Sequence, residues 1–301
     1  MKQFLLRVCL FMTIILIVDV LSGFLFSYLR IHAKGGSTAN CEYIANGSSE
    51  EVIILGSSRA THHYIPAIIS DSLGLSCYNC GEEGNGIVLA YGRYKMITSR
   101  YCPKLIIYEV SPEYDCLEAE TNIKYLEYLK PYYKKEPIKA IVNDFGGEYI
   151  SLKMFSNMYQ NSSRLLPNVF DNIVFRDNMD GYSPLYGKIS FLPKPIEKID
   201  MSIDSKKLGY LESLIRDAND KNISICFVVS PQYCIEEFDE EKYDPIIQLC
   251  NAYNLPFLNY SSISGLSDNS SYFQDILHMN NDGAIVYTKL FVNMIKDYVN
   301  L

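Results

Sequence analysis

Three residues have the types and spacing needed for nucleophilic catalysis. Ser58 follows the apolar run Val52 to Leu55, which stops at Gly56. Asp275 and His278 form a D-x-x-H arrangement just before the last predicted helix. A serine hydroxyl is a weak nucleophile until a base takes its proton, and the base works better when a carboxylate orients it. These residues therefore predict a serine nucleophile, a histidine base and an orienting aspartate.

The surroundings of Ser58 fit this chemistry. A short aliphatic run that ends at glycine is typical of a strand buried on both faces, and Ser57-Ser58-Arg59-Ala60 then predicts a tight turn into a helix. Ser58 would lie at the carboxyl end of a parallel strand, where open α/β sheets place their ligand sites. It would also lie at a helix N-terminus, whose N–H groups favour developing negative charge.

Two further histidines, His62 and His63, follow Ser58 on its own predicted helix. Adjacent helical residues point about 100° apart, so both cannot face one serine. We expect them to be exposed residues of the helix, with a place at the rim of the pocket as the alternative. His278 is therefore the predicted base.

The blocks around these residues, in this order along the chain, resemble the SGNH/GDSL hydrolase superfamily. Gly56-Ser57-Ser58 matches the family's first block with serine in place of aspartate, and the final D-x-x-H block is intact. Gly84 matches the glycine of the second block. The resemblance implies an oxyanion hole formed by the N–H groups of Ser58 and Gly84. It also suggests that Ser57 and Arg59 lie beside the pocket.

The third block of that family supplies an asparagine after the third strand, and here the sequence departs from the pattern. The predicted strand Leu105 to Val110 is followed by Ser111-Pro112-Glu113, so Glu113 stands roughly at the asparagine position. An ionised glutamate only accepts hydrogen bonds. Glu113 is thus expected near the pocket, either facing away from it or protonated by burial and able to donate.

Composition excludes several other classes. The 301 residues carry a net charge of −8 without a basic stripe, so no nucleic-acid partner is expected. Nine cysteines include the pair Cys77 and Cys80 in C-x-x-C spacing, but no second such pair exists. We therefore predict no metal and no cofactor, and a thiol enzyme is a remote alternative. Cys226 lies in an apolar run and is expected in the core.

The amino-terminal segment predicts a membrane anchor. Val8 to Leu29 is nearly unbroken apolar sequence of membrane-spanning length, interrupted by Asp19. Lys2 and Arg7 precede it, which favours a cytoplasmic N-terminus and an exported remainder, periplasmic or extracellular. No A-x-A-like cleavage site follows, so an uncleaved signal anchor is favoured over a removed signal peptide.

The remaining pattern predicts domain organisation and fold class. We expect residues 1–30 to be the tip and anchor, 31–50 a polar linker, and 51–301 an SGNH hydrolase-like domain. Strands alternate with helices, which favours a three-layer α/β/α flavodoxin-like sandwich around a five-stranded parallel sheet. The expected strands are 52–55, 76–79, 105–110, 223–229 and 256–260. Residues 116–203 lose regular patterning and predict an insertion, either a substrate-recognition lid or an elaboration over a sheet edge.

Together these features predict a membrane-anchored serine esterase or O-acyltransferase. Its substrate would be an acyl ester, most simply an acetyl ester, on a cell-envelope or extracellular polysaccharide, or a small ester. The altered first block and the missing asparagine motivate a second hypothesis. In that hypothesis the chain is a catalytically inactive protein on the same fold that binds glycan or scaffolds an export complex.

Overall fold

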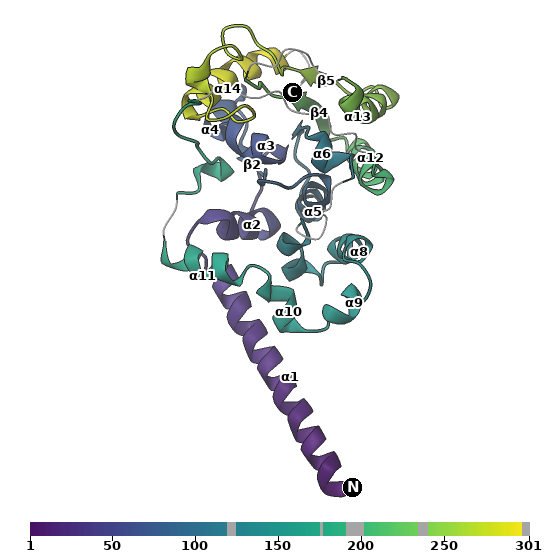
Figure 1. Cartoon of the computed structure of the whole chain (residues 1–301). Helices are drawn as coiled ribbons and strands as arrows, with labels where there is room; N and C mark the ends of the chain where they lie inside the picture. Colours follow the sequence, from purple (N-terminus) through teal and green to yellow (C-terminus); the bar gives the residue numbers. More distant parts are fainter. Residues whose placement is uncertain (119–124, 175–176, 191–201, 234–239, 297–301) are drawn as a thin grey trace. The chain divides into compact units, whose positions relative to one another are not determined.

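The computed structural model describes residues 1–118, 125–174, 177–190, 202–233 and 240–296 (Figure 1). The chain divides into two compact units. Unit 1 consists of residues 1–47 and 121–177, and unit 2 consists of residues 48–120 and 178–301.

Unit 2 is built on a five-stranded parallel sheet in the order β2-β1-β3-β4-β5. The strands are β1 Val52–Gly56, β2 Cys77–Asn79, β3 Leu105–Glu109, β4 Ser224–Val229 and β5 Phe257–Asn259. This is the flavodoxin-like order. The predicted α/β fold class is confirmed, and each strand end lies within one residue of its predicted position.

Helices pack against both faces of this sheet because its central strands are apolar on both sides. The helices of unit 2 are α3 Ser58–His63, α4 Pro66–Leu73, α5 Ile87–Thr98, α6 Pro112–Asp115, α12 Ser205–Asp220, α13 Glu240–Ala252 and α14 Asn281–Ile295, with 3-10 turns η3 Met179–Gly181 and η4 Ser270–Tyr272. Helices α3 and α4 pack with α14, and α5 packs with α12. Val52 and Ile54 cluster with Tyr287 and Phe291 of α14. The alternate residues of β1 face the opposite layer.

The sequence pattern also predicts helix caps, at Asp204 or Ser205 and at Asn281 or Asp282, and a last helix that ends at Tyr298. Asp204 caps α12 by accepting hydrogen bonds from the N–H groups of Lys206 and Lys207. The cap of α14 is Asn280, which accepts from Gly283 N–H, so the predicted caps Asn281 and Asp282 are wrong by one or two residues. The amide of Asn280 also donates to two carbonyls, at 2.8 and 2.7 Å, which holds this residue outside the helix. The predicted end of this helix at residue 298 lies outside the described residues.

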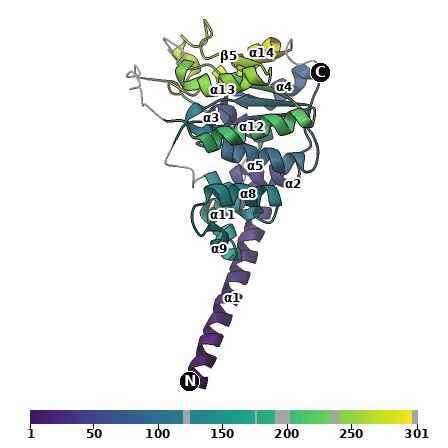
Figure 2. The same cartoon turned by 90° about the vertical axis from the view of Figure 1, so that its right-hand side faces the viewer.

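Unit 1 is helical. It contains α1 Lys2–Ile31, α2 Gly36–Asn46, η1 Leu126–Tyr128, η2 Lys130–Tyr132, α8 Glu136–Phe145, α9 Ile150–Lys153, α10 Asn157–Ser162 and α11 Leu165–Ile173. The carboxyl-terminal half of α1 packs against α10, α11 and α2, whereas its amino-terminal half extends away from the other helices of the unit (Figures 1 and 2). Among the described residues, α1 is the one helix that is both long enough and apolar enough to cross a membrane.

Two parts of the predicted organisation differ from the structure. Residues 31–50, expected to be a linker, contain α2, whose Thr38, Ile44 and Ala45 are buried. The region 116–203, expected to be one insertion, contributes 121–177 to unit 1 and its later residues to unit 2. Helix α2 could not be predicted from apolar periodicity because many of its contacts are polar. Thr38, for example, forms hydrogen bonds with Asn168 and Asp171.

Candidate active site

Ser58 is the first residue of α3, directly after the carboxyl end of β1. The strand reaches this point through Gly56, which has a φ of +137°. A Cβ there would lie 2.5 Å from the carbonyl oxygen of Glu109 on the neighbouring strand. Glycine is therefore needed for the chain to leave the sheet here, and this turn presents Ser58 at the sheet edge.

The structure brings Asp275 and His278 to Ser58 across 220 residues of sequence. His278 Nε2 lies 2.8 Å from Ser58 Oγ. His278 Nδ1 lies 2.9 Å from Asp275 Oδ2 and 3.0 Å from Oδ1. Because the carboxylate only accepts, this network assigns the proton to Nδ1 and leaves Nε2 to accept from the Ser58 hydroxyl.

The loop around Asp275 fixes its carboxylate. The N–H groups of Leu277 and His278 donate to Asp275 Oδ1 at 2.8 and 2.9 Å. Partial burial acts to raise the pKa of Asp275, but the hydrogen bonds from His278 and the Leu277 N–H prevail, so its pKa lies below the ordinary value. Asp275 is therefore the charged partner of His278. Ser58 is half-buried, and the His278 side chain is 22% exposed, so a substrate can reach both.

The loop that carries Gly84 is held beside the end of β1. The N–H of Glu82 donates to the Gly56 carbonyl at 3.2 Å. Gly84 has a φ of +63°, a conformation that glycine adopts without strain. The side chain of Glu83 reaches His62 Nε2 at 3.1 Å. The assignment of the Gly84 N–H as an oxyanion donor stays a prediction.

The three predicted pocket residues have different surroundings. Ser57 is buried, and within the described residues its Oγ has no hydrogen-bond partner. Arg59 is also buried, with its Nε 3.2 Å from Glu109 Oε1, and it donates to the Val110 carbonyl. Glu113 pairs with Lys242. Arg59 is thus tied to β3, and a Glu113 carboxylate in an ion pair does not replace the missing asparagine donor.

Burial of Arg59 acts to lower its pKa, but the Glu109 carboxylate more than offsets this, so the pKa lies above the ordinary value. Arg59 therefore stays protonated, and the Glu109 carboxylate balances its charge.

His62 and His63 are buried, at 3% and 0% exposure, so the prediction that they are exposed is wrong. The His62 Nδ1–H donates to the Ser183 carbonyl at 2.6 Å. His63 Nε2 accepts from Met279 N–H at 2.9 Å, and Met279 directly follows His278. Neither ring stands between Ser58 and a carboxylate, since that position is filled by His278.

A buried chain of hydrogen bonds continues from His63 under the sheet edge. Because Nε2 accepts, Nδ1 carries the proton and donates to Ser230 Oγ at 2.7 Å. Ser230 Oγ in turn donates to Glu109 Oε1 at 2.9 Å. Glu109 also accepts from Tyr64. The chain therefore links the ends of β3 and β4 to the loop that carries His278.

Sequence reasoning missed Glu109 as a member of this network. Burial raises the pKa of Glu109, although Arg59 and the hydrogen bonds from Tyr64 and Ser230 oppose that effect. A charged residue inside a buried parallel strand is rare unless it is paired, and this was the signal that could have identified it. Its partner Ser230 directly follows β4, at the edge of the sheet where open α/β folds place their ligand sites.

The cysteines do not form a second reactive centre in the part of the chain that the structure describes. Cys77 and Cys80 are both buried. Burial raises the pKa of Cys77 well above its ordinary value, which disfavours a thiolate. Cys226 is in the core, as predicted. Among the described residues, no cluster of His, Cys, Asp or Glu could hold a metal ion.

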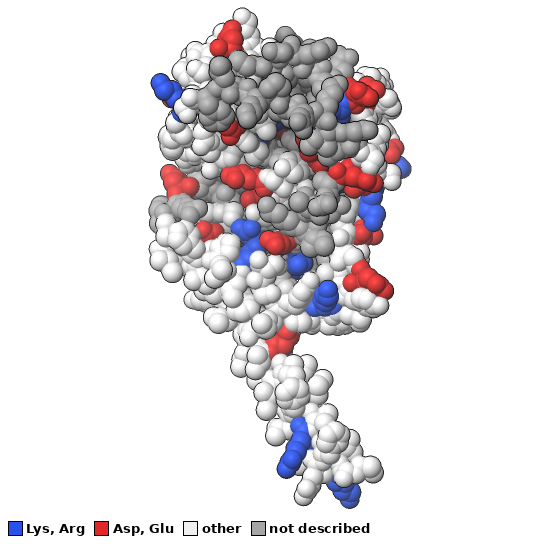
Figure 3. Space-filling model, in the orientation of Figure 1, with Lys and Arg blue, Asp and Glu red and all other residues white. Residues whose placement is uncertain are grey.

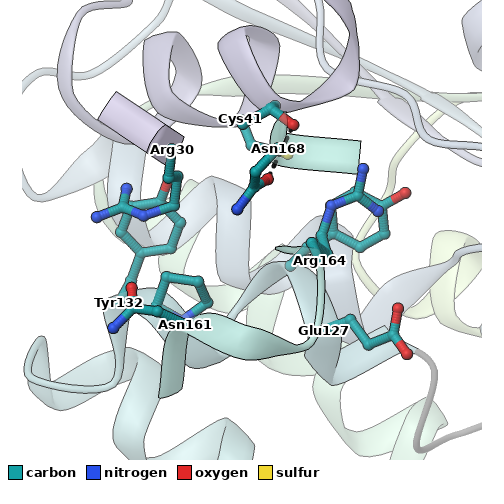
Figure 4. A pocket seen from close by; sticks show the side chains of 10 residues that line it. Arg30, Cys41, Glu127, Tyr132, Asn161, Arg164 and Asn168 are labelled. Atoms are coloured by element: carbon teal, nitrogen blue, oxygen red, sulfur yellow. Dashed lines mark hydrogen bonds between the residues drawn. The ribbon is translucent and has the colours of Figure 1, made fainter. Parts of the chain in front are cut away.

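One pocket lies within unit 1 and contains none of the predicted site residues (Figure 4). Arg30 lies over the Tyr132 ring and pairs with Glu42. Arg164 lies 3.9 Å from the centre of the Tyr128 ring and donates to Ser37 Oγ at 2.5 Å. Both cations are therefore engaged by protein groups.

Solved structures that match the chain include a G-D-S-L family protein and two esterases. A G-D-S-L family protein from Desulfitobacterium hafniense matches at 9% identity, covering 81% of this chain and 98% of its own, with a TM-score of 0.42. The esterase EstA from a Pseudoalteromonas species matches at 10% identity, covering 83% and 100%, with a TM-score of 0.44. An acetylxylan esterase from Geobacillus stearothermophilus matches at 10% identity, covering 83% and 95%, with a TM-score of 0.42. A scan of protein-family models and a comparison with curated proteins found no match.

Proposed function

We propose that the chain is a serine ester hydrolase or O-acyltransferase of the SGNH/GDSL superfamily, with Ser58, His278 and Asp275 as its triad. The observation that carries the proposal is the position of His278, with Nε2 2.8 Å from Ser58 Oγ and Nδ1 2.9 Å from Asp275 Oδ2. At that distance the imidazole can take the serine proton as the hydroxyl attacks.

The reaction follows from this geometry. Ser58 Oγ attacks the ester carbonyl while His278 Nε2 takes its proton, and the N–H groups of Ser58 and Gly84 stabilise the oxyanion. One such donor is worth about 3 kcal/mol of barrier. His278 then protonates the leaving alcohol, and an acyl group remains on Ser58. Water, or a sugar hydroxyl, gives its proton to His278 and attacks the acyl-enzyme. As the bond between the acyl group and Ser58 Oγ breaks, His278 returns the proton to Oγ and Ser58 is free again.

We place the substrate outside the cytoplasm. Lys2 and Arg7 precede the apolar part of α1, which favours a cytoplasmic N-terminus and an exported catalytic unit. An anchored, exported esterase acts on esters within reach of the membrane. We therefore propose acyl esters of cell-envelope or extracellular polysaccharide, with acetyl as the simplest group. The triad is the same for transfer to water and to a sugar hydroxyl.

The test is turnover of p-nitrophenyl acetate by the full chain in detergent micelles. Ser58→Ala and His278→Ala should each lower kcat/KM by at least about 10³-fold, because the triad acts as a unit. Ser213→Ala is the matched control, since Ser213 is an exposed residue of α12 whose hydroxyl donates to the Gly209 carbonyl of the same helix. Full activity in Ser58→Ala would refute the mechanism.

No turnover by the wild type would leave a transferase that requires its own donor, or the inactive binding protein. Covalent labelling at Ser58 separates these two, since only the enzyme has an activated serine.

A further inference from the structure

We propose that α9, α10 and α11 are embedded in the membrane leaflet next to the carboxyl-terminal half of α1, and that bilayer lipid covers their exposed apolar face. Unit 1 is then a membrane-seated module. This inference rests on the insertion of α1 proposed above and is independent of the ester chemistry.

Helix α11 exposes its apolar face and buries its polar face, the reverse of a surface helix in a soluble protein. Leu166, Phe170 and Ile173 are spaced i, i+4 and i+7 on one face and are 81%, 48% and 75% exposed. Asn168 and Asp171 are buried. A surface helix of a soluble protein turns its apolar stripe to the core and its polar face to water. The orientation of α11 therefore fits an apolar surrounding.

The polar face of α11 is used inside unit 1. Asp171 Oδ2 accepts from Thr38 N–H at 3.2 Å, and Asn168 Oδ1 accepts from the Thr38 hydroxyl at 3.0 Å. Asn172 Nδ2 donates to the Leu29 carbonyl at 2.6 Å. These bonds fix α11 to the end of α1 and to α2. They also determine that its apolar residues face outward.

The turn between α9 and α10 also exposes large apolar side chains. Leu152, Phe155 and Met158 are 62%, 82% and 42% exposed. Lys153 is the one charged residue in the sequences of α9 and α10, and its long stem lets the ammonium group reach the lipid phosphates. Soluble monomers rarely expose contiguous apolar patches of this kind.

The position of Asp19 sets the depth of α10. The N–H groups of Asn157 and Met158 donate to the Asp19 carboxylate at 2.9 and 3.1 Å, and the Ser156 hydroxyl also donates to it. The apolar run Val8 to Leu29 is about 33 Å long as a helix and matches a hydrocarbon core of about 30 Å. Asp19 lies near its middle, so the start of α10 reaches into the hydrocarbon region. The acid is tolerated there because α10 satisfies it.

The opposite face of α1 supports an apolar surrounding at the same level. Leu21, Phe24 and Leu25 remain 63%, 72% and 55% exposed beside the docked α10 and α11. Figure 3 shows the free length of α1 without charged side chains except near its amino end. Arg30, which ends the apolar run, is the first cation after it and stacks on Tyr132 (Figure 4). Within unit 1, α1 and the segment from α9 to α11 therefore all expose large apolar side chains.

The absence of tryptophan from the chain allows a direct test. Single tryptophans are introduced in the full chain as Phe155→Trp and Phe170→Trp, and the protein is reconstituted into phosphatidylcholine vesicles with or without brominated acyl chains. Phe11→Trp in α1 is the control for membrane insertion, and Tyr186→Trp, 72% exposed in unit 2, is the control for water. All four positions are surface residues, so the substitutions leave the core intact.

We expect tryptophan at 155 and 170 to show blue-shifted emission and to lose intensity in brominated vesicles as Phe11→Trp does. Emission like that of Tyr186→Trp, unquenched by bromine, would overturn the inference while Phe11→Trp still reports insertion. Protection from both bromine and aqueous acrylamide would also overturn it, because a protein partner would then cover the face. If the brominated lipids do not quench the tryptophan of Phe11→Trp, α1 is not inserted in the bilayer. That result would overturn the membrane anchor and, with it, this inference.

Discussion

At the residue scale, the proposed chemistry depends on how firmly His278 is held. Its ring is fixed by Asp275 on one side, and the next residue, Met279, is fixed by its N–H bond to His63. His63 acts only through Met279, so it is a positioning residue. Its ring must stay neutral, because protonation of Nε2 would remove the acceptor that Met279 N–H needs.

Neutral His63 makes stability depend on pH. Burial lowers the pKa of His63 well below 6.5, and the charges of His278 and Arg59 act in the same direction. Below about pH 6.5 the unfolded chain binds a proton that the folded chain excludes, so the free energy of unfolding falls as pH falls, by up to about 1.4 kcal/mol per pH unit. The stability conferred by the neutral ring is complete above that pH.

We predict that His63→Gln removes this pH dependence. A glutamine does not titrate, so the gap in stability between wild type and variant should be constant above pH 7 and shrink as pH falls below 6.5. Unfolding of the full chain in micelles, followed by circular dichroism between pH 5 and 8, measures it. His32→Gln, at an exposed residue of unit 1, is the control. Parallel curves for wild type and His63→Gln would contradict the network.

Part of the site could be predicted from the sequence because part of its signal is local. Ser58 follows a strand and a glycine, and Asp275 and His278 share one short turn. His63, Ser230 and Glu109 are joined only by bonds between distant elements. The spacing of these residues in the sequence does not predict this hydrogen-bond network, which could be identified only from the structure.

At the element scale, the strands and α1 were predictable, whereas the other helices of unit 1 were not. Each strand is a buried apolar run with a sharp end, which is a local signal. Helix α2 and helix α11 instead pack through polar faces, as Thr38 and Asp171 show. Sequence rules for soluble helices expect polar residues to face water. Residues 31–50 were therefore predicted to be a linker, and no helical periodicity was recognised in 116–203.

The packing of α1 against α10 gives a prediction at this scale. A Cβ on Gly23 would lie 2.5 Å from Asn157 Cβ, whereas one on Gly209, in α12, would meet nothing within 4 Å. Alanine favours a helix over glycine by about 1 kcal/mol. Gly209→Ala should therefore keep or raise the melting temperature of the full chain in micelles, and Gly23→Ala should lower it.

The readout for this pair is thermal unfolding together with limited proteolysis across residues 150–173. Release of α10 should make this segment more sensitive to protease in Gly23→Ala alone. Equal behaviour of the two variants would mean that α10 does not depend on its contact with α1.

At the scale of the whole molecule, α1 packs against α2, α10 and α11 as part of unit 1. Removal of α1 would leave Asn157, Asn172 and Glu42 without the partners that they have on it. The full chain in detergent or bilayer is therefore the appropriate material for every assay.

The most direct test of the central claim is labelling of the full chain by a serine-directed fluorophosphonate, with the modified peptide identified by mass spectrometry. The phosphonate should attach to Ser58 in the wild type, not at all in Ser58→Ala, and far more slowly in His278→Ala. Labelling that misses Ser58, or that is equally fast in His278→Ala, would contradict a serine nucleophile activated by this histidine.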